Sequence, residues 1–273
     1  MKHTAKRLRL DAELVRRGLA RSRAHASELV EAGRVTVAGT VASKPATAVG
    51  TDAALVVHAD KTGVDADWAS RGAHKLLGAL AAFEVTVKGR RCLDAGASTG
   101  GFTDVLLRSG AREVVAADVG RGQLIWRLAN DQRVTVLDRT NVRHLELATI
   151  GEPAELIVAD LSFISLSLVL PALSVCATDD ADLLPMVKPQ FEVGKKAVGA
   201  GGVVRDPELR ADAVDGVVRS AGELGWRLHG AVASPLPGPS GNVEYFVWLR
   251  RGEPLDPLRS KEIVRAAVAA GPS

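Results

Sequence analysis

Apolar and polar positions alternate in a regular way over most of the chain. Short apolar runs bounded by Gly, Asp or Pro predict strands, and apolar residues spaced three and four apart predict helices. The predicted strands beyond residue 90 are 91–94, 113–118, 134–137, 156–160, 181–188, 227–234 and 243–250. A helix capped by Ser70 comes before them, and further helices are predicted near 101–109, 122–130, 164–175 and 207–224. This order is typical of an α/β fold with a seven-stranded, mostly parallel sheet, whose last two strands form an antiparallel edge pair.

The spacing of apolar residues differs over residues 8–57 and predicts a small α/β module. Asp11 and Ser22 are placed to cap two short helices that end at Gly18 and Gly33. Strands follow at 35–37, after the Ala38–Gly39 turn and at 55–57. Because ADKTGVDAD (59–67) has no apolar period, we expect domains at 1–59 and 70–273 joined by a linker at 60–69.

Composition and charge add a possible partner for the first module. Of 273 residues, 47% are hydrophobic and 25% charged, which is ordinary for a soluble globular protein. Residues 1–60 hold ten Lys/Arg and six Asp/Glu, a net charge of +4, whereas the remainder carries −1. A basic module suggests a polyanionic partner, although on charge alone a solvated surface is an equal alternative.

The sequence indicates a cytoplasmic protein. Cys92 and Cys176 stand in apolar surroundings and are expected to be reduced core residues. The basic start MKHTAKRLRLD lacks the apolar segment of a signal peptide. The uncharged run from Leu161 to Thr178 contains four serines and Pro171, which favours a buried helix over a membrane span. No Cys, His or acid cluster has metal-ligand spacing, so no metal is expected.

Polar residues gather at the predicted strand ends, where ligands bind in parallel sheets. They are Asp94, Asp118, Asp138, Asp160 and Lys188. The glycine-rich turn LDAGASTGGFT (93–103) follows the first strand and is expected to let a ligand approach its backbone. It lacks both the Gly-Lys-Ser/Thr of an ATP-binding loop and the full G-x-G-x-x-G spacing. An acid about 20 residues later, Asp118, is placed to accept the hydroxyls of an adenosine ribose, and the segment 138–141 to face the adenine.

The run from Arg9 to Pro45 closely resembles the S4 RNA-binding domain, through its Leu-Asp start, Gly18, Ser22-Arg23, Gly33-x-Val-x-Val and Gly39 turn. The resemblance implies binding of structured RNA through the helix pair; the alternative is a basic helical hairpin that binds protein. The candidate RNA-binding residues, including basic residues near the predicted pocket, are Arg7, Arg9, Arg16, Arg17, Arg21, Arg23, Arg34, Lys44, Arg71, Lys195 and Lys196.

The turn, Asp118 and Asp138 resemble a class I S-adenosylmethionine methyltransferase. Four further motifs, SRGAHKL (70–76), ADLSFIS (159–165), VKPQFEVGK (187–195) and SPLPGPSGNVEYF (234–246), resemble the TlyA family. Its members pair an S4 domain with an FtsJ-like methyltransferase domain and are also labelled hemolysins. One departure is Ala69, where relatives often have Val, and it bears on linker packing. The resemblance implies S-adenosylmethionine as cofactor, bound by Asp94, Gly96, Ala97, Ser98, Thr99, Gly100, Gly101, Phe102, Thr103, Asp118, Val119, Asp138, Arg139, Thr140, Asn141 and Asp160.

The family resemblance also implies 2′-O-methylation of cytidine in 16S or 23S rRNA of ribosomal subunits, with sensitivity to capreomycin as a consequence. FtsJ-like enzymes use a Lys-Asp-Lys-Glu set, which matches Lys75, Asp160, Lys188 and Glu244. A ribose hydroxyl is a poor nucleophile, so it needs alignment and a group that takes its proton or polarises its oxygen. A lysine serves as the base only if burial or a second cation lowers its pKa. We assign this role to Lys188, with Lys75 tuning it and the two carboxylates orienting the lysines.

Other functions stay open from the sequence. An inactive methyltransferase fold would leave an RNA-binding assembly factor, although all four catalytic positions are intact. A pore-forming hemolysin would need a membrane span or a strongly basic amphipathic helix, which the sequence lacks. Pseudouridine synthases also carry S4 domains, but their chemistry has no use for a glycine-rich nucleotide turn.

Overall fold

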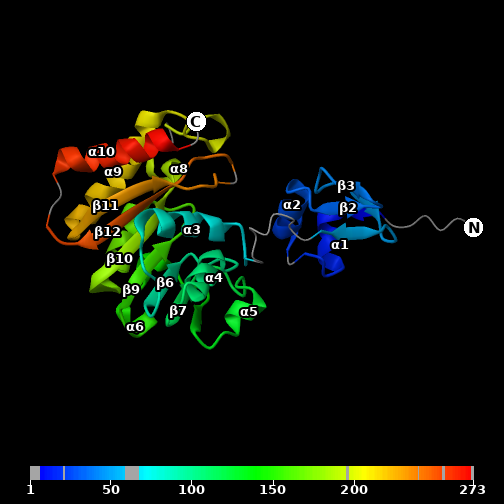
Figure 1. Ribbon diagram of the computed structural model, residues 1–273, viewed down its shortest axis with the longest axis horizontal. Coiled ribbons are helices and arrows are strands. Elements are labelled where there is room, and N and C mark those ends of the chain that lie inside the picture. Colours follow the sequence, from blue (N-terminus) through cyan, green and yellow to red (C-terminus); the bar gives the residue numbers. More distant parts are fainter. Residues whose placement is uncertain are drawn as a thin grey trace, which may run out of the picture. The chain divides into compact units, whose positions relative to one another are not determined.

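The computed structural model describes residues 7–20, 22–58, 68–194, 197–238, 240–253 and 256–271. The chain divides into two compact units, Met1–Asp67 and Trp68–Ser273 (Figure 1). Each unit has its own hydrophobic core, so each is described by itself.

The small unit is a helix pair packed with short antiparallel strands. Strand β2 lies between β3 and β5, and β1 pairs with β4. Leu10, Leu14, Leu29, Val30 and Val35 are buried in its core. Its elements are β1 (Arg7–Arg9), α1 (Leu10–Arg16), α2 (Arg23–Glu31), β2 (Val35–Val37), β3 (Thr40–Val41), β4 (Ala48–Gly50) and β5 (Leu55–Val57).

Of the two predicted helix caps in this unit, one is confirmed and one is wrong. Ser22 Oγ accepts a hydrogen bond from the amide of His25 at 3.1 Å and so caps α2. Helix α1 begins one residue before Asp11, because β1 runs directly into it and the Leu10 amide bonds to the Thr47 carbonyl at 2.8 Å. The buried Asp11 carboxylate instead pairs with the guanidinium groups of Arg9 and Arg23, which ties α1 to α2.

The large unit is built on a seven-stranded sheet in the order β11-β12-β10-β9-β6-β7-β8. Strand β12 is antiparallel to both neighbours, and the pairs from β10 to β8 are parallel. The predicted α/β fold and its mostly parallel sheet are therefore confirmed. The strands are β6 (Arg91–Ala95), β7 (Glu113–Ala117), β8 (Val134–Leu137), β9 (Ala154–Ala159), β10 (Ala177–Val187), β11 (Trp226–Ala233) and β12 (Tyr245–Arg251).

Helices cover both faces of this sheet, and strand residues alternate between two cores. Leu93 and Ile157 face a core with α7, α9 and α10, whereas Cys92 and Leu156 face one with α3 and α4. Figure 1 shows α9 and α10 running beside β11. The helices are α3 (Gly72–Phe83), α4 (Gly101–Arg108), α5 (Trp126–Ala129), α6 (Leu147–Ile150), α7 (Leu170–Val175), α8 (Pro189–Glu192), α9 (Pro207–Glu223) and α10 (Pro257–Ala270), with short 3₁₀ turns η1 (Val142–His144), η2 (Leu166–Leu168) and η3 (Ala200–Gly202).

Several helices differ from the prediction, and the short helices α6 and α8 were not predicted. The helix expected at 122–130 is only α5, because Ile125 is extended and its amide bonds to the Thr99 carbonyl. The helix expected at 164–175 is split into η2 and α7. Helix α10 was not predicted, although Asp256 caps it and Pro257 stands at its first position. None of the helices in the described ranges has both the length and the apolar content of a membrane-spanning segment.

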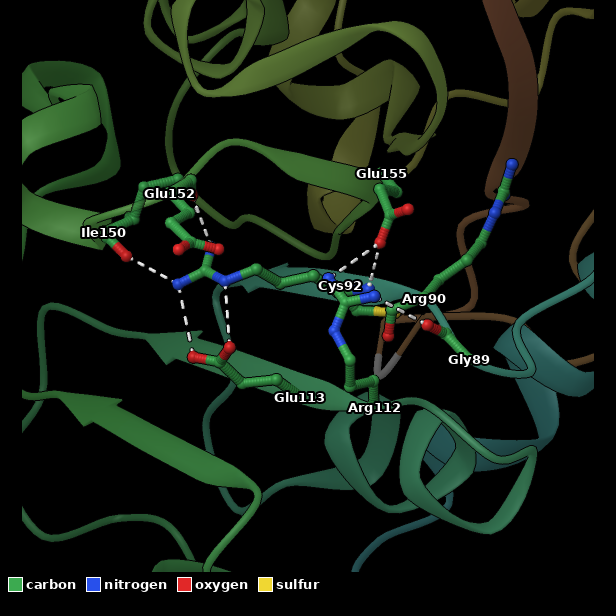
Figure 2. Close-up of polar contacts among 9 residues, drawn as sticks. Gly89, Arg90, Cys92, Arg112, Glu113, Ile150, Glu152 and Glu155 are labelled. Atoms are coloured by element: carbon green, nitrogen blue, oxygen red, sulfur yellow. Dashed lines mark hydrogen bonds and ion pairs between the residues drawn. The ribbon is translucent and has the colours of Figure 1, made fainter.

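A buried arginine joins three elements at the edge of the sheet where β6 begins. The guanidinium of Arg91 pairs with Glu113 of β7 at 3.0 Å and donates to the carbonyls of Ile150 and Glu152 (Figure 2). Arg112 lies on the same side, where it pairs with Glu155 at 3.2 Å, but its side chain is 56% exposed. Because the buried Arg91 satisfies two carbonyls and the partly exposed carboxylate of Glu113, its removal leaves these groups without their donor.

We expect Arg91→Met to lower the free energy of unfolding by about 3 kcal/mol, the usual cost of breaking a buried hydrogen-bonded ion pair. Arg112→Met is the matched control, and its cost should stay below about 1 kcal/mol because its pair is solvated. Denaturant unfolding of both variants measures the difference. Equal losses of unfolding free energy in the two variants would contradict the role of Arg91 in joining β6 to β7 and to the carbonyls of residues 150 and 152.

Candidate functional site

Four charged side chains from distant parts of the sequence meet in the large unit. Lys75 comes from α3, Asp160 directly follows β9, Lys188 directly follows β10, and Glu244 directly precedes β12. Lys75 Nζ donates to Glu244 Oε2 at 2.5 Å. Lys188 Nζ lies 2.6 Å from Asp160 Oδ1 and 3.9 Å from Glu244 Oε1. The structure thus brings together all four residues that the sequence singled out for catalysis.

This cluster explains why a lysine follows an apolar strand. The Lys188 side chain is 9% exposed and that of Glu244 only 1%, so both charges have left bulk water. Burying a charge is costly unless it is paired. Here two ammonium groups and two carboxylates form one row of ion pairs, in which Glu244 lies between the two lysines. The arrangement is charge-balanced and fixes the direction of both amino groups.

Sequence reasoning missed one member of this cluster. Lys188 Nζ also donates to the hydroxyl of Ser162 at 3.0 Å. Ser162 lies two residues beyond Asp160, in the ADLSFIS motif, so a hydroxyl close behind a strand-end acid was the available signal.

Gly238 lies against the carboxylate of Glu244, and Asn242 is close by in the sequence. A side chain at Gly238 would bring its Cβ to 2.6 Å from Glu244 Oε1, so the backbone at Gly238 packs directly against this carboxylate. Asn242 is buried and was also missed by sequence reasoning. Its amide accepts from the Val204 N–H at 2.9 Å and donates to the Gly202 carbonyl at 2.8 Å. These two bonds hold the backbone at Gly202 and Val204.

The glycine-rich turn lies directly against the charged cluster. The Asp160 amide donates to the carbonyl of Ala95 at 3.1 Å. Gly96 has φ 91°, and a Cβ there would come to 2.5 Å from the Asp160 carbonyl oxygen. Gly100 has φ 102°, and its Cβ would meet the side chains of Leu124 and Leu128. These glycines let the turn pack closely against its own protein, and their role toward a ligand stays a prediction.

The Asp94 carboxylate is buried beneath this turn. Thr103 Oγ1 donates to its Oδ2 at 2.6 Å, whereas Oδ1 has no hydrogen-bond partner among the described residues. Burial raises the pKa of Asp94 to about 7, although the hydrogen bond from Thr103 opposes this shift. A buried acceptor without a donor has unused capacity for a cationic or N–H group.

Asp118 and Asp138 stand where the sequence placed them, just after β7 and β8. The Asp118 carboxylate accepts from the amides of Ser98 at 2.9 Å and Gly120 at 2.7 Å, which joins the two loops. Asp138 accepts from the amide of Gly122 at 2.9 Å. A carboxylate has about four lone-pair sites, so Asp118 keeps acceptor capacity. Val119, beside it, is 67% exposed.

The other predicted cofactor residues differ in their exposure and in the contacts of their side chains. Thr99 and Thr140 are half-buried and Arg139 is exposed beside this turn, whereas Ala97 and Gly101 are buried. The Phe102 ring lies in the core, 5.9 Å from Phe246, so its side chain serves packing. The side chain of Asn141 accepts from the Arg143 amide and caps η1. The side chains of Phe102 and Asn141 thus have structural contacts, and their assignment to the cofactor stays a prediction.

Arginines of the small unit surround α1 and α2. Arg7, Arg9, Arg16 and Arg23 are exposed. Arg16 and Arg17 share the buried carboxylate of Glu13, at 2.6 and 2.7 Å. Arg17 also donates to the carbonyls of Thr51 and Ala53, so all three of its side-chain nitrogens have partners inside the unit. Its assignment as an RNA ligand stays a prediction.

The remaining basic candidates divide by position. Lys44 and Arg71 are exposed, and half-buried Arg34 donates through Nε to the His58 carbonyl at 3.0 Å. Arg21, Lys195 and Lys196 lie outside the described residues.

Comparison with known proteins matches both units to families. The FtsJ-like methyltransferase family matches residues 68–251, and the S4 domain family matches residues 8–55. The 16S/23S rRNA (cytidine-2′-O)-methyltransferase TlyA from Mycobacterium tuberculosis is 61% identical over 270 residues, which cover 98% of this chain and all of that protein.

Two further relatives carry a different name. Hemolysin A from Brachyspira hyodysenteriae is 35% identical over 241 residues, covering 88% of this chain and 98% of its own. A solved structure of a hemolysin from Streptococcus thermophilus has a TM-score of 0.76 at 33% identity, covering 97% of this chain and 96% of its own.

The raised pKa of Asp94 predicts a pH-dependent stability. Between pH 3.8, the ordinary pKa of an aspartate, and about pH 7, the folded protein holds a proton on Asp94 that the unfolded chain has lost. Stability from this group is therefore complete below pH 3.8 and is lost as pH rises through 7. We expect Asp94→Asn to remove this decline, as measured by urea unfolding from pH 5 to 8.

Thr103→Val is the control, because loss of its hydrogen bond should move the decline to higher pH. If Asp94→Asn and wild type keep a constant difference in unfolding free energy across this range, the Asp94 carboxyl is not protonated in the folded protein.

Proposed function

Because the chain belongs to the TlyA family of FtsJ-like methyltransferases that carry an S4 domain, we propose that it methylates the ribose 2′-hydroxyl of a cytidine in 16S or 23S rRNA. The observation that carries this proposal is the meeting of Lys75, Asp160, Lys188 and Glu244 beside the glycine-rich turn. Ribosomal subunits are the proposed partner, which makes the cytoplasm its place of action.

Within this site we assign Lys188 to the 2′-hydroxyl. Its amino group is held by Asp160 and Ser162 and lies at a strand end, where ligands reach a parallel sheet. Glu244 lies between the two lysines, so Lys75 fixes Glu244 and Glu244 in turn limits the freedom of Lys188. Such fixed alignment is the main means of accelerating a transfer between two bound molecules.

The residues around the turn fit S-adenosylmethionine, which supplies an electrophilic methyl group on a positively charged sulfur. The unpartnered Oδ1 of Asp94 supports this fit, because the cofactor carries both a sulfonium and an ammonium group. Asp118 would accept ribose hydroxyls with its remaining lone pairs, and exposed Val119 offers an apolar contact for the base. Gly96, Ser98, Thr99, Asp138, Arg139 and Thr140 complete the proposed binding region.

The small unit would hold the RNA. Its exposed arginines Arg7, Arg9, Arg16 and Arg23, with Lys44, are suited to phosphates, which the guanidinium fork binds in bidentate fashion. Such contacts position an RNA without reading its bases, so selection of the cytidine would rest on the shape of the rRNA.

We expect Lys188→Ala to abolish methyl transfer, with at least a 100-fold loss of kcat, while cofactor affinity changes little. Transfer of labelled methyl groups to purified 30S subunits, 50S subunits and naked rRNA measures the loss and identifies the modified ribose. Lys88→Ala is the matched control, an exposed lysine that should keep full activity. Normal transfer by Lys188→Ala would overturn the assignment, and no 2′-O-methylation by wild type would overturn the function.

A double variant tests RNA binding by the small unit. In Arg16→Gln/Arg23→Gln, each buried carboxylate keeps a second arginine, because Glu13 retains Arg17 and Asp11 retains Arg9. We therefore expect an intact fold, weaker rRNA binding and a salt dependence reduced by about one unit of slope per lost phosphate contact.

Filter binding at several salt concentrations measures this effect. Arg265→Gln, an exposed arginine of the large unit, is the control and should leave the slope unchanged. An unchanged slope in the double variant would remove Arg16 and Arg23 from the RNA-binding surface.

A further inference from the structure

The three groups that contact Lys188 differ in how firmly the fold holds them in place. Asp160 directly follows β9 and its amide bonds to Ala95 of β6, and Glu244 directly precedes β12, so strands fix both carboxylates. Ser162, the third contact, is in an exposed turn beyond the end of β9. Without further support, the direction of its hydroxyl toward Lys188 would depend on a flexible segment.

This turn, residues 161–165, is strained as well as exposed. Phe163 has φ 65°, a left-handed conformation that is unfavourable for a residue with a side chain. Its side chain is 91% exposed, so core burial does not hold it there. An unfavourable backbone conformation persists only where surrounding contacts impose it.

Glu192 supplies such contacts at the other end of the turn. Its carboxylate accepts from the Ser165 hydroxyl at 2.6 Å and from the Leu166 amide at 2.8 Å. Burial raises the pKa of Glu192, and these two hydrogen bonds oppose the shift. A half-buried carboxylate that uses both oxygens on one turn acts as a fixed attachment for it.

Glu192 and Lys188 belong to the same short stretch of chain. Glu192 ends α8, which begins at Pro189 directly after Lys188. The two segments therefore run side by side, joined by Lys188–Ser162 at one end and Glu192–Ser165 at the other. Between these bonds the rings of Phe163 and Phe191 lie 5.2 Å apart.

We propose that Glu192 is a positioning residue of the methyl-transfer site, which fastens the 161–166 segment to α8 so that Ser162 directs the amino group of Lys188. The inference rests on the proposed role of Lys188 in that reaction. Glu192 touches neither substrate nor cofactor in this scheme. It acts through Ser162, and its effect should appear in the rate of transfer and not in binding.

Glu192→Ala tests the proposal in the full-length chain with rRNA and S-adenosylmethionine. We expect kcat to fall about tenfold or more with little change in KM for either substrate, since small misplacements of reacting groups cost rate. Glu192→Gln should recover most of the activity. Its amide oxygen still accepts from the Leu166 N–H, and its amide nitrogen can donate to Ser165.

The double variant Ser162→Ala/Glu192→Ala separates positioning from general stability. If Glu192 acts through Ser162, the double variant should be no slower than the slower single variant. Ser167→Ala is the matched control, because it leaves both hydrogen bonds of Glu192 in place and should keep kcat within about twofold. Circular dichroism melting of each variant checks the fold. If Glu192→Ala does not fold, Ser165→Ala removes one of the two bonds and should lower kcat in the same way.

Wild-type kcat in a folded Glu192→Ala or Ser165→Ala, or rate losses that multiply in the double variant, would overturn the positioning role. Failure of the wild-type chain to methylate rRNA would instead overturn the proposed function, so the two failures are distinguishable.

Discussion

The ion-pair chain from Lys75 through Glu244 and Lys188 to Asp160 is the constraint on which the large unit depends. Four charges are removed from most of the solvent within one small volume, and each is tolerable only because an opposite charge stands beside it. The pairing therefore requires a fold that delivers four chain segments to one place. Removing Glu244 would leave the largely buried Lys75 without its carboxylate, so geometry and charge balance are inseparable here.

The sheet meets this requirement through its strand order. Strands β6, β9 and β10 are parallel neighbours, so their last residues emerge at one edge. Strand β12 is antiparallel to β10, which brings its first residue to that same edge and places Glu244 beside Lys188. A parallel β12 would have carried Glu244 to the opposite edge. The antiparallel direction of β12 is thus a condition for the charged cluster.

The sequence was most informative where one strong local pattern decided the outcome. Strand ends were predicted to within one residue at Asp118, Asp138, Asp160 and Lys188, because an apolar run stops at a charge. Prediction failed where tertiary contacts override a local preference. Asp11 has the chemistry of a cap, but β1 imposes an earlier helix start. Asn242 carries no local signal, since its partner Val204 lies 38 residues away, whereas the hydroxyl of Ser162 close behind Asp160 was a signal that sequence reasoning did not use.

The two edges of the sheet hold different kinds of structure. Ser98, Arg139 and Phe163, three non-glycine residues with positive φ, all stand in turns that follow strands at the edge with the charged cluster. The edge where β6 begins has the Arg91 network, in which the polar partners are satisfied. Substitutions in the Arg91 network therefore change contacts at the end of the sheet that is away from the charged cluster.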